Sequence, residues 1–330
     1  MSKFMLNTLG LGSVGIASYF WGRSSTPQSP VQPPSNPTST GIVPAKGNNQ
    51  NSVGAFDPAT IRPQDFFKYG YPGPNHDLGN RNEFISCYDR STRNPYWVLE
   101  HITPQSIKSV EGVDRKKSVF REDEAIPLKF RARLRDYFRS GYDRGHQAPA
   151  ADAKFTQETM NETFLLTNMS PQVGDGFNRD YWAHFEDFCR RLTQKYDNVR
   201  IMTGPLYLPK LCEDDKYRVT YEVIGSPPNI AVPTHFFKLV VGEKNGDEQI
   251  AAAAFVMPNE PIDNARSLTE FQVPIDALER SAGLELLQKV PYYNKKDLCR
   301  EVKCEIIVRE FPKAIQRAAS APAGLPAPRN

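Results

Sequence analysis

Strand-like runs that follow one another without intervening helices constrain the fold of this 330-residue chain most strongly. Apolar patterning indicates strands at 83–88, 97–101, 164–168, 199–203, 217–224, 235–241, 250–256 and 304–308. Helical periodicity is confined to 127–139, 179–196 and 274–287. Consecutive strands favour an α+β fold, with an antiparallel-rich mixed sheet and flanking helices, over alternating strand–helix units.

The two ends of the chain differ in composition from its body. Residues 1–23 hold an uncharged apolar run between Lys3 and Arg23, which suits a mitochondrial leader or a membrane anchor, with a secretory signal as the alternative. Residues 24–53 are rich in Pro, Ser, Thr and Asn, and 313–330 in Ala and Pro, which predicts a flexible linker and a disordered tail. A single folded domain is therefore expected over 54–312.

The cysteine pattern does not indicate a disulfide framework. The chain has five cysteines, an odd number spread over a domain of ordinary size: Cys87, Cys189, Cys212, Cys299 and Cys304. Cys299 and Cys304 are close in sequence, but no second pair lies nearby to complete a zinc site. All five are expected to be free thiols.

Net charge alone does not predict a polyanionic partner. The formal charge of +3 is carried by the first 50 residues, which contain Lys3, Arg23 and Lys46 and no acid. A local concentration does occur between Arg115 and Arg144, where ten basic residues face five acids. This basic patch is either a solvated helix face or a positive field that attracts nucleic acid.

The patch leads into a cluster of polar residues at 142–152, 166–172 and 176–182. The cluster contains one of only five histidines, His146, with Arg144 two positions before it and Asn168 and Asn178 after it. An arginine can pair with a phosphate, and a histidine can take a proton from water near neutral pH. Asparagine oxygens suit a hard cation such as magnesium. These residue types together suit phosphodiester cleavage.

The ordered motif resembles that of a known nuclease family. Asp143-Arg144-Gly145-His146 with Pro149, the block 168–172, and Asn178 ahead of Trp182 and Glu186 are similar to the sugar-non-specific DNA/RNA nucleases of the His-Me finger (ββα-metal) class. The likeness extends over about residues 62–312 and is greatest to the endonuclease G-like enzymes of mitochondria. It implies a ββα-metal core, cleavage of DNA and RNA, a homodimer, and a place at the mitochondrial inner membrane or in the intermembrane space.

The resemblance also assigns roles to single residues. It implies that His146 is the general base, on the first strand of a hairpin, and that Asn168 on the second strand orients it. Asn178, at the start of the next helix, would be the direct ligand of one Mg²⁺. Oxygen ligands would also accept Mn²⁺ at this site. Arg144 would contact phosphate, and Glu186 would hold water around the metal.

Some of these assignments have competing interpretations. Arg115 matches a phosphate-binding arginine of the family, but Arg93 competes for that role, although its setting is more typical of a turn. Arg144 would otherwise form a salt bridge with Asp143 or Asp152. For the whole chain, the alternatives are a non-catalytic nucleic-acid-binding module that uses the 115–144 patch and a membrane-tethered structural protein.

Overall fold

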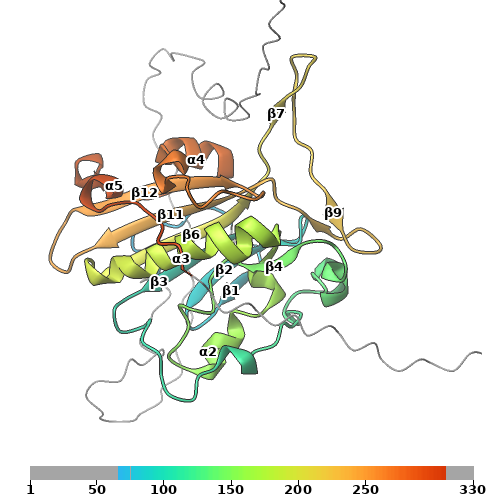
Figure 1. Cartoon of the computed structure of the whole chain (residues 1–330), viewed down its shortest axis with the longest axis horizontal. Coiled ribbons are helices and arrows are strands. Elements are labelled where there is room, and N and C mark those ends of the chain that lie inside the picture. The colour runs from blue at the N-terminus through green and yellow to red at the C-terminus, as the bar shows by residue number, and fades with distance from the viewer. Residues whose placement is uncertain (1–65, 75, 310–330) are drawn as a thin grey trace, which may run out of the picture.

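A central antiparallel sheet organises the structure, a computed structural model that describes residues 66–74 and 76–309 (Figure 1). Its eight strands follow the order β1-β2-β3-β6-β11-β12-β13, with β14 beside β12. They are β1 (Leu78–Asn80), β2 (Phe84–Asp89), β3 (Asn94–Ile102), β6 (Asn198–Leu206), β11 (His235–Glu243), β12 (Ile250–Pro258), β13 (Gln272–Val273) and β14 (Lys295–Asp297). Only the β12–β14 pair is parallel. The α+β fold expected from the sequence is confirmed.

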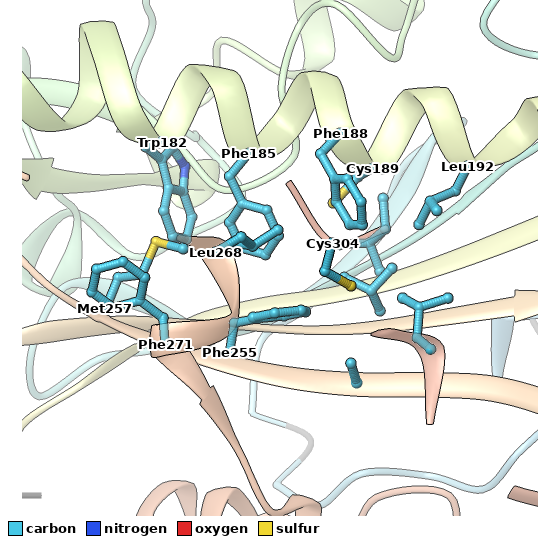
Figure 2. Close-up of a cluster of buried hydrophobic side chains, with 14 of the residues drawn as sticks. Trp182, Phe185, Phe188, Cys189, Leu192, Phe255, Met257, Leu268, Phe271 and Cys304 are labelled. Carbon is cyan, nitrogen blue, oxygen red and sulfur yellow. The ribbon is translucent and has the colours of Figure 1, made fainter. Parts of the chain in front are cut away.

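Both faces of the sheet are covered, which explains why β11 is apolar on both sides. Helix α3 (Trp182–Arg191) packs Trp182, Phe185 and Phe188 against the face of the sheet that carries Phe255 (Figure 2). Phe236 of the same face lies 5.7 Å from the Trp182 ring. Helix α4 (Ile275–Ala282) packs Leu278 on the opposite face, which carries residues such as Phe237 and Leu239. Each fully buried side chain of this kind contributes roughly 1.5–3 kcal/mol.

Smaller elements complete the domain on the α3 side and at its edges. Strand β4 (Asp143–His146) pairs with β5 (Met169–Gln172), β7 (Lys210–Leu211) with β8 (Tyr217–Arg218), and β9 (Val223–Ile224) with β10 (Ile230–Ala231). The short helices are α2 (Gln157–Glu162) and α5 (Leu298–Glu301). The β7–β8 hairpin projects away from the body of the domain (Figure 1).

Single 3₁₀ turns connect these elements. They are η3 (Arg115–Lys117), η4 (Leu128–Phe130), η5 (Leu134–Tyr137), η6 (Leu166–Asn168), η8 (Leu192–Gln194), η9 (Leu268–Phe271) and η10 (Tyr292–Asn294). Strands β2, β3, β6, β11 and β12 coincide with the sequence-predicted runs to within a few residues. Within the part of the chain that is described, no helix is long and apolar enough to span a bilayer. The predicted segments 1–23, 24–53 and 313–330 lie outside the described residues.

The helix predicted over 127–139 does not form, and this prediction was wrong. The segment instead forms η4 and η5 with extended backbone at Arg131 and Arg133 between them. Tertiary partners take the backbone groups there: Tyr88 Oη accepts from Ala132 N at 3.1 Å, and Asn229 Nδ2 donates to the Arg131 carbonyl at 3.1 Å. Burial of Tyr137 then directs the chain inward, so helical periodicity was overridden by packing.

Three strand predictions were also displaced or wrong. The run 164–168 forms a loop and η6, and the strand begins only at Met169. Residues 217–224 are split into β8 and β9, and 304–308 has no regular structure. Both long helix predictions were offset: the first is preceded by an irregular turn, in which Asp175 and Gly176 have non-helical backbone, and α4 ends at Ala282, where Gly283 with a φ of +67° terminates it.

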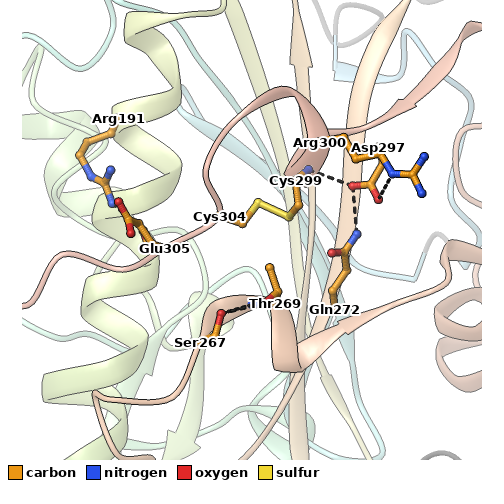
Figure 3. Close-up of a disulfide and its surroundings, with 9 residues drawn as sticks. All are labelled: Arg191, Ser267, Thr269, Gln272, Asp297, Cys299, Arg300, Cys304 and Glu305. Atoms are coloured by element: carbon orange, nitrogen blue, oxygen red, sulfur yellow. Dashed lines mark hydrogen bonds and ion pairs between the residues drawn. A yellow bond between two sulfur atoms is a disulfide. The ribbon is translucent and has the colours of Figure 1, made fainter.

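The expectation that all cysteines are free is corrected by a disulfide between Cys299 and Cys304. Asp297 caps α5 by accepting from Cys299 N at 2.9 Å, which turns the chain so that the two sulfurs meet (Figure 3). Cys304 is buried in the same cluster as Cys189 beneath α3 (Figure 2). An odd number of cysteines was thus compatible with one disulfide between two cysteines that are close in sequence.

Candidate active site

The β4–β5 hairpin positions His146. His146 lies opposite Met169 and Gly145 lies opposite Ser170 in the antiparallel register. Gly145 has no room for a side chain, because an added Cβ would lie 1.9 Å from Gln172 Oε1. The Gln172 side chain is itself fully buried. The hairpin therefore requires glycine before the histidine for close packing.

His146 is held in a small aromatic pocket. Its ring lies 4.9 Å from the Phe164 ring, edge-on, and 5.6 Å from the Phe120 ring. The residue is 8% exposed, and its Nε2 has no hydrogen-bond partner among the described residues. Burial, followed by the positive charges of Arg115 and Arg144, holds the pKa of His146 well below its usual range. The imidazole is thus neutral at pH 7 and able to accept a proton.

Two arginines flank the same aromatic pair. The Arg144 guanidinium lies 4.3 Å from the Phe120 ring centroid, and that of Arg115 lies 5.6 Å from the centroid of Phe164. No described residue forms an ion pair with either guanidinium. The acids considered as partners of Arg144 are engaged elsewhere: Asp143 with Arg179 at 3.3 Å, and Asp152 with Arg190 at 2.8 Å. Burial lowers the pKa of both guanidinium groups, although the negative charges of Asp143 and Glu186 still act on the pKa of Arg144 and Arg115 respectively.

Arg93 does not join this group. Its guanidinium donates to the backbone carbonyls of Arg90, Ser91 and Lys129, and its φ is +59°. It closes the turn between β2 and β3, in agreement with the turn interpretation of its sequence setting. The aromatic residues Phe120 and Phe164 were missed from sequence, because nothing in the local pattern distinguishes them from core residues.

Asn168 fixes the loop that follows His146. Its Oδ1 accepts from Ala148 N at 2.9 Å, and its Nδ2 donates to the carbonyls of Ala148 at 2.9 Å and Thr163 at 2.8 Å. Its backbone carbonyl also accepts from Gln147 N. The residue lies in η6 just before β5, rather than on the strand as predicted. Its side chain therefore bonds to the backbone beside His146 and to Thr163, and not to the imidazole.

Asn178 lies in the π-helical turn η7 (Gly174–Tyr181), with its backbone N–H donating to the Val173 carbonyl. π-helical turns are common at functional sites. The side-chain Nδ2 donates to Asp143 Oδ2 at 2.8 Å. Because the nitrogen is committed to this acceptor, the amide orientation is fixed and Oδ1 is the atom that a cation would meet. Asp143 at the start of β4 thus couples Asn178 to the hairpin that carries His146.

Glu186 lies on α3, the helix that directly follows η7, and is surrounded by buried charged side chains. Burial raises the pKa of its carboxyl to about 7, and the positive charges of Lys238 and Arg190 oppose this rise. Lys238 is 1% exposed on β11, donates to Thr203 Oγ1 at 2.8 Å, and lies 4.8 Å from the Trp182 ring. Sequence analysis did not identify Lys238, because a single lysine in an apolar strand gives no signal of what it faces.

The residues of this site fit a hard cation bound by one neutral protein ligand. The orientation of Asn178 presents an amide oxygen to such a cation. In the described part of the chain, no group of three or more His, Cys, Asp or Glu side chains is arranged to hold a metal.

A β-hairpin bearing a neutral histidine, packed beside a helix bearing an asparagine and a glutamate, defines a ββα-metal nuclease. The chain belongs to the DNA/RNA non-specific endonuclease family, which matches residues 62–293, and it is accordingly an endonuclease of a metal-dependent family. It is similar to the "Mitochondrial nuclease" of Saccharomyces cerevisiae, with 58% identity over 99% of this chain and 98% of that protein.

Other relatives agree with this membership. "Endonuclease G, mitochondrial" of Homo sapiens is 44% identical over 66% of this chain and 71% of its own length. Among solved structures, a chain from the crystal structure of the EndoG/EndoGI complex superposes with a TM-score of 0.68 at 45% identity. That match covers 71% of this chain and 96% of the solved one.

Proposed function

We propose that this endonuclease hydrolyses phosphodiester bonds in both DNA and RNA, with His146 as the general base. The observation that carries the proposal is the unpartnered Nε2 of a neutral His146 between two aromatic rings that each bear an arginine. His146 takes a proton from the attacking water, while Arg144 and Arg115 bind the phosphate on either side. Asn168 keeps the histidine loop in place throughout.

Asn178 is the proposed protein ligand of a single Mg²⁺. When bound, the ion supplies positive charge to the phosphate and to the leaving oxygen, and an oxygen site of this kind would also accept Mn²⁺. Asp143 holds the Asn178 amide in the orientation that presents Oδ1. Glu186 holds water beside the site in its ionised form. Contacts to phosphate rather than to base edges support activity without sequence or sugar preference.

The test compares cleavage of supercoiled plasmid and total RNA, with magnesium and with EDTA. We expect His146→Ala to reduce both activities at least about a hundredfold, the lower end of what a general base contributes. Asn178→Ala should raise the magnesium concentration needed for cleavage. His76→Ala, at a histidine outside the site, is the matched control and should behave as wild type.

Absence of cleavage by the wild type, together with intact salt-sensitive binding, would instead support the binding-module alternative based on the 115–144 patch. Full activity of His146→Ala would exclude that residue as the base. These two results are independent, because the first concerns the whole chain and the second concerns one side chain.

The cellular setting is also a proposal. The relatives from Saccharomyces cerevisiae and Homo sapiens are named as mitochondrial, which supports a mitochondrial location for this chain. The composition of residues 1–23 and 24–53 supports a leader or membrane anchor followed by a linker, at the inner membrane or in the intermembrane space. Imaging of a tagged chain with and without residues 1–23 tests both points.

A further inference from the structure

Residues 135–139 expose an aromatic ring between two arginines immediately before β4. Phe138 is 62% exposed, whereas its neighbour Tyr137 is buried. The Arg139 guanidinium lies 5.1 Å from the Phe138 ring centroid, and both Arg135 and Arg139 are exposed. We call Arg135, Phe138 and Arg139 the Phe138 surface. A single exposed aromatic ring is common on protein surfaces, but one flanked by two arginines combines a stacking face for a base with cations for the backbone of a nucleic-acid strand.

The acids near this surface are hydrogen-bonded to other groups rather than paired with its arginines. The only acid of the segment, Asp136, is buried and accepts from Arg133 N at 2.9 Å and from Asn229 Nδ2 at 2.6 Å. In the ranges that the structure describes, neither Arg135 nor Arg139 forms an ion pair. Glu122 is hydrogen-bonded beside this surface: its Oε1 accepts from Leu134 N at 3.2 Å. The surface is therefore suited to an anionic ligand.

The surface is rigidly connected to the active site. Tyr137 packs in one cluster with Leu166 and Met169, beside Phe120, and its charge environment includes Arg144. Ser140 N donates to the Tyr137 carbonyl, and Tyr142 N donates to Ser140 Oγ at 3.2 Å, which fixes the turn between Phe138 and β4. Phe138 precedes Arg144 by six residues in the chain, so the two lie within about 22 Å of each other, a span of a few nucleotides.

We propose that the Phe138 surface is a subsite for an unpaired base and its flanking phosphates, so that single-stranded DNA or RNA binds more tightly than duplex. This rests on the proposed function, because the site supplies the strand. Every base has a π-face that can stack on Phe138, whereas bases within a duplex are already stacked on one another. Arg135 and Arg139 would contact the phosphates on either side.

The test measures binding of the full-length chain to a labelled oligo(dT) of about 20 nucleotides in EDTA. The same strand with abasic sites, and its duplex with oligo(dA), serve as probes without an available base. We expect Phe138→Ala to weaken oligo(dT) binding about 5- to 150-fold, the range for loss of one stacked base. Binding to the abasic strand and to the duplex should change little.

Two further variants separate stacking from charge. Arg135→Ala with Arg139→Ala should lower the slope of log affinity against log salt for oligo(dT) by about 0.7 for each phosphate that an arginine no longer neutralises. Tyr292→Ala is the control, since Tyr292 is 90% exposed and follows α4, which covers the opposite face of the sheet. It should bind every probe as wild type does.

Equal weakening of the oligo(dT) and abasic probes by Phe138→Ala would overturn the base subsite, as would wild-type binding by that variant. Plasmid cleavage in magnesium is measured in parallel. Cleavage by the wild type with no effect of Phe138→Ala would refute the subsite alone. A base-dependent effect of Phe138→Ala without any cleavage would refute the proposed function and leave the subsite standing.

Discussion

At the residue scale, burial divides the titratable groups of the site into two kinds. His146 is kept neutral by burial and by two arginines, so its pKa lies well below the range where activity is usually measured. Burial raises the pKa of Glu186 to about 7, so this carboxyl changes charge within that range. The proposed base is therefore neutral throughout the physiological pH range, and in the proposed mechanism we expect Glu186 to limit activity on the acid side.

We predict that Lys238→Met moves the acid limb of the pH profile of kcat/KM to higher pH. Glu186 is needed as a carboxylate, which exists above its pKa and is lost as pH falls through about 7. Lys238 lowers that pKa, so removal of its charge raises it further and the limb follows. Thr203→Val removes the hydrogen bond to Lys238 but keeps the charge, and should shift the limb less. A limb that stays in place in Lys238→Met would contradict the assignment to Glu186.

The polar members of the site could be predicted from sequence, whereas their supporting residues could not. His146, Asn168 and Asn178 follow from an ordered motif of chemically distinctive residue types. Phe120, Phe164 and Lys238 reach the site from three other segments, and only tertiary packing reveals them. An aromatic ring that supports a catalytic group has the same sequence pattern as one in the core.

At the element scale, the central strands were predictable because their apolar runs match the period of a buried sheet. Strands β2, β3, β6, β11 and β12 are of this kind. Segments with mixed patterns were not predictable: 127–139 has helical spacing but gives its backbone hydrogen bonds to Tyr88 and Asn229. The disulfide of the C-terminal segment was missed because the capping turn at Asp297, not the cysteine spacing, brings the sulfurs together.

This disulfide fastens the C-terminal segment beneath α3, the helix that carries Glu186. Arg191 of α3 also donates to the Glu305 carbonyl at 2.9 Å (Figure 3). We predict that replacing Cys299 and Cys304 together by alanine lowers the free energy of unfolding by about 2 kcal/mol, because the bridge closes a short loop. Urea titration of wild type and variant measures the difference.

Reductant provides the control for this prediction. Dithiothreitol should lower the wild-type unfolding midpoint toward that of the double variant and should not change the midpoint of the variant itself. Cys212→Ala, at a free cysteine, should unfold as wild type does. Equal midpoints with and without reductant would show that the bridge does not stabilise the segment.

At the scale of the whole molecule, the projecting arm of residues 210–224 carries the largest apolar side chains that the fold leaves uncovered in this region. Every second residue from Tyr217 to Val223 is 45–51% exposed: Tyr217, Val219, Tyr221 and Val223. Between them, Glu222 turns back to the domain and accepts from Tyr142 Oη at 3.0 Å, next to β4. An apolar stripe of this kind usually marks a protein interface.

We predict that this stripe is buried in the interface of the homodimer that the family resemblance implies. Val219→Glu together with Tyr221→Glu would place charges in the interface and should give a monomer in sedimentation velocity, whereas the wild type is expected to sediment as a dimer. Tyr292→Glu, at an exposed tyrosine away from the arm, should remain dimeric. Glu222 is hydrogen-bonded to Tyr142, which directly precedes β4, so the arm is connected to the strand that carries His146. Loss of the dimer should therefore lower plasmid cleavage, whereas the unfolding midpoint should stay unchanged. A wild type that is monomeric at every concentration would refute the dimer, and a dimeric double variant would place the interface elsewhere.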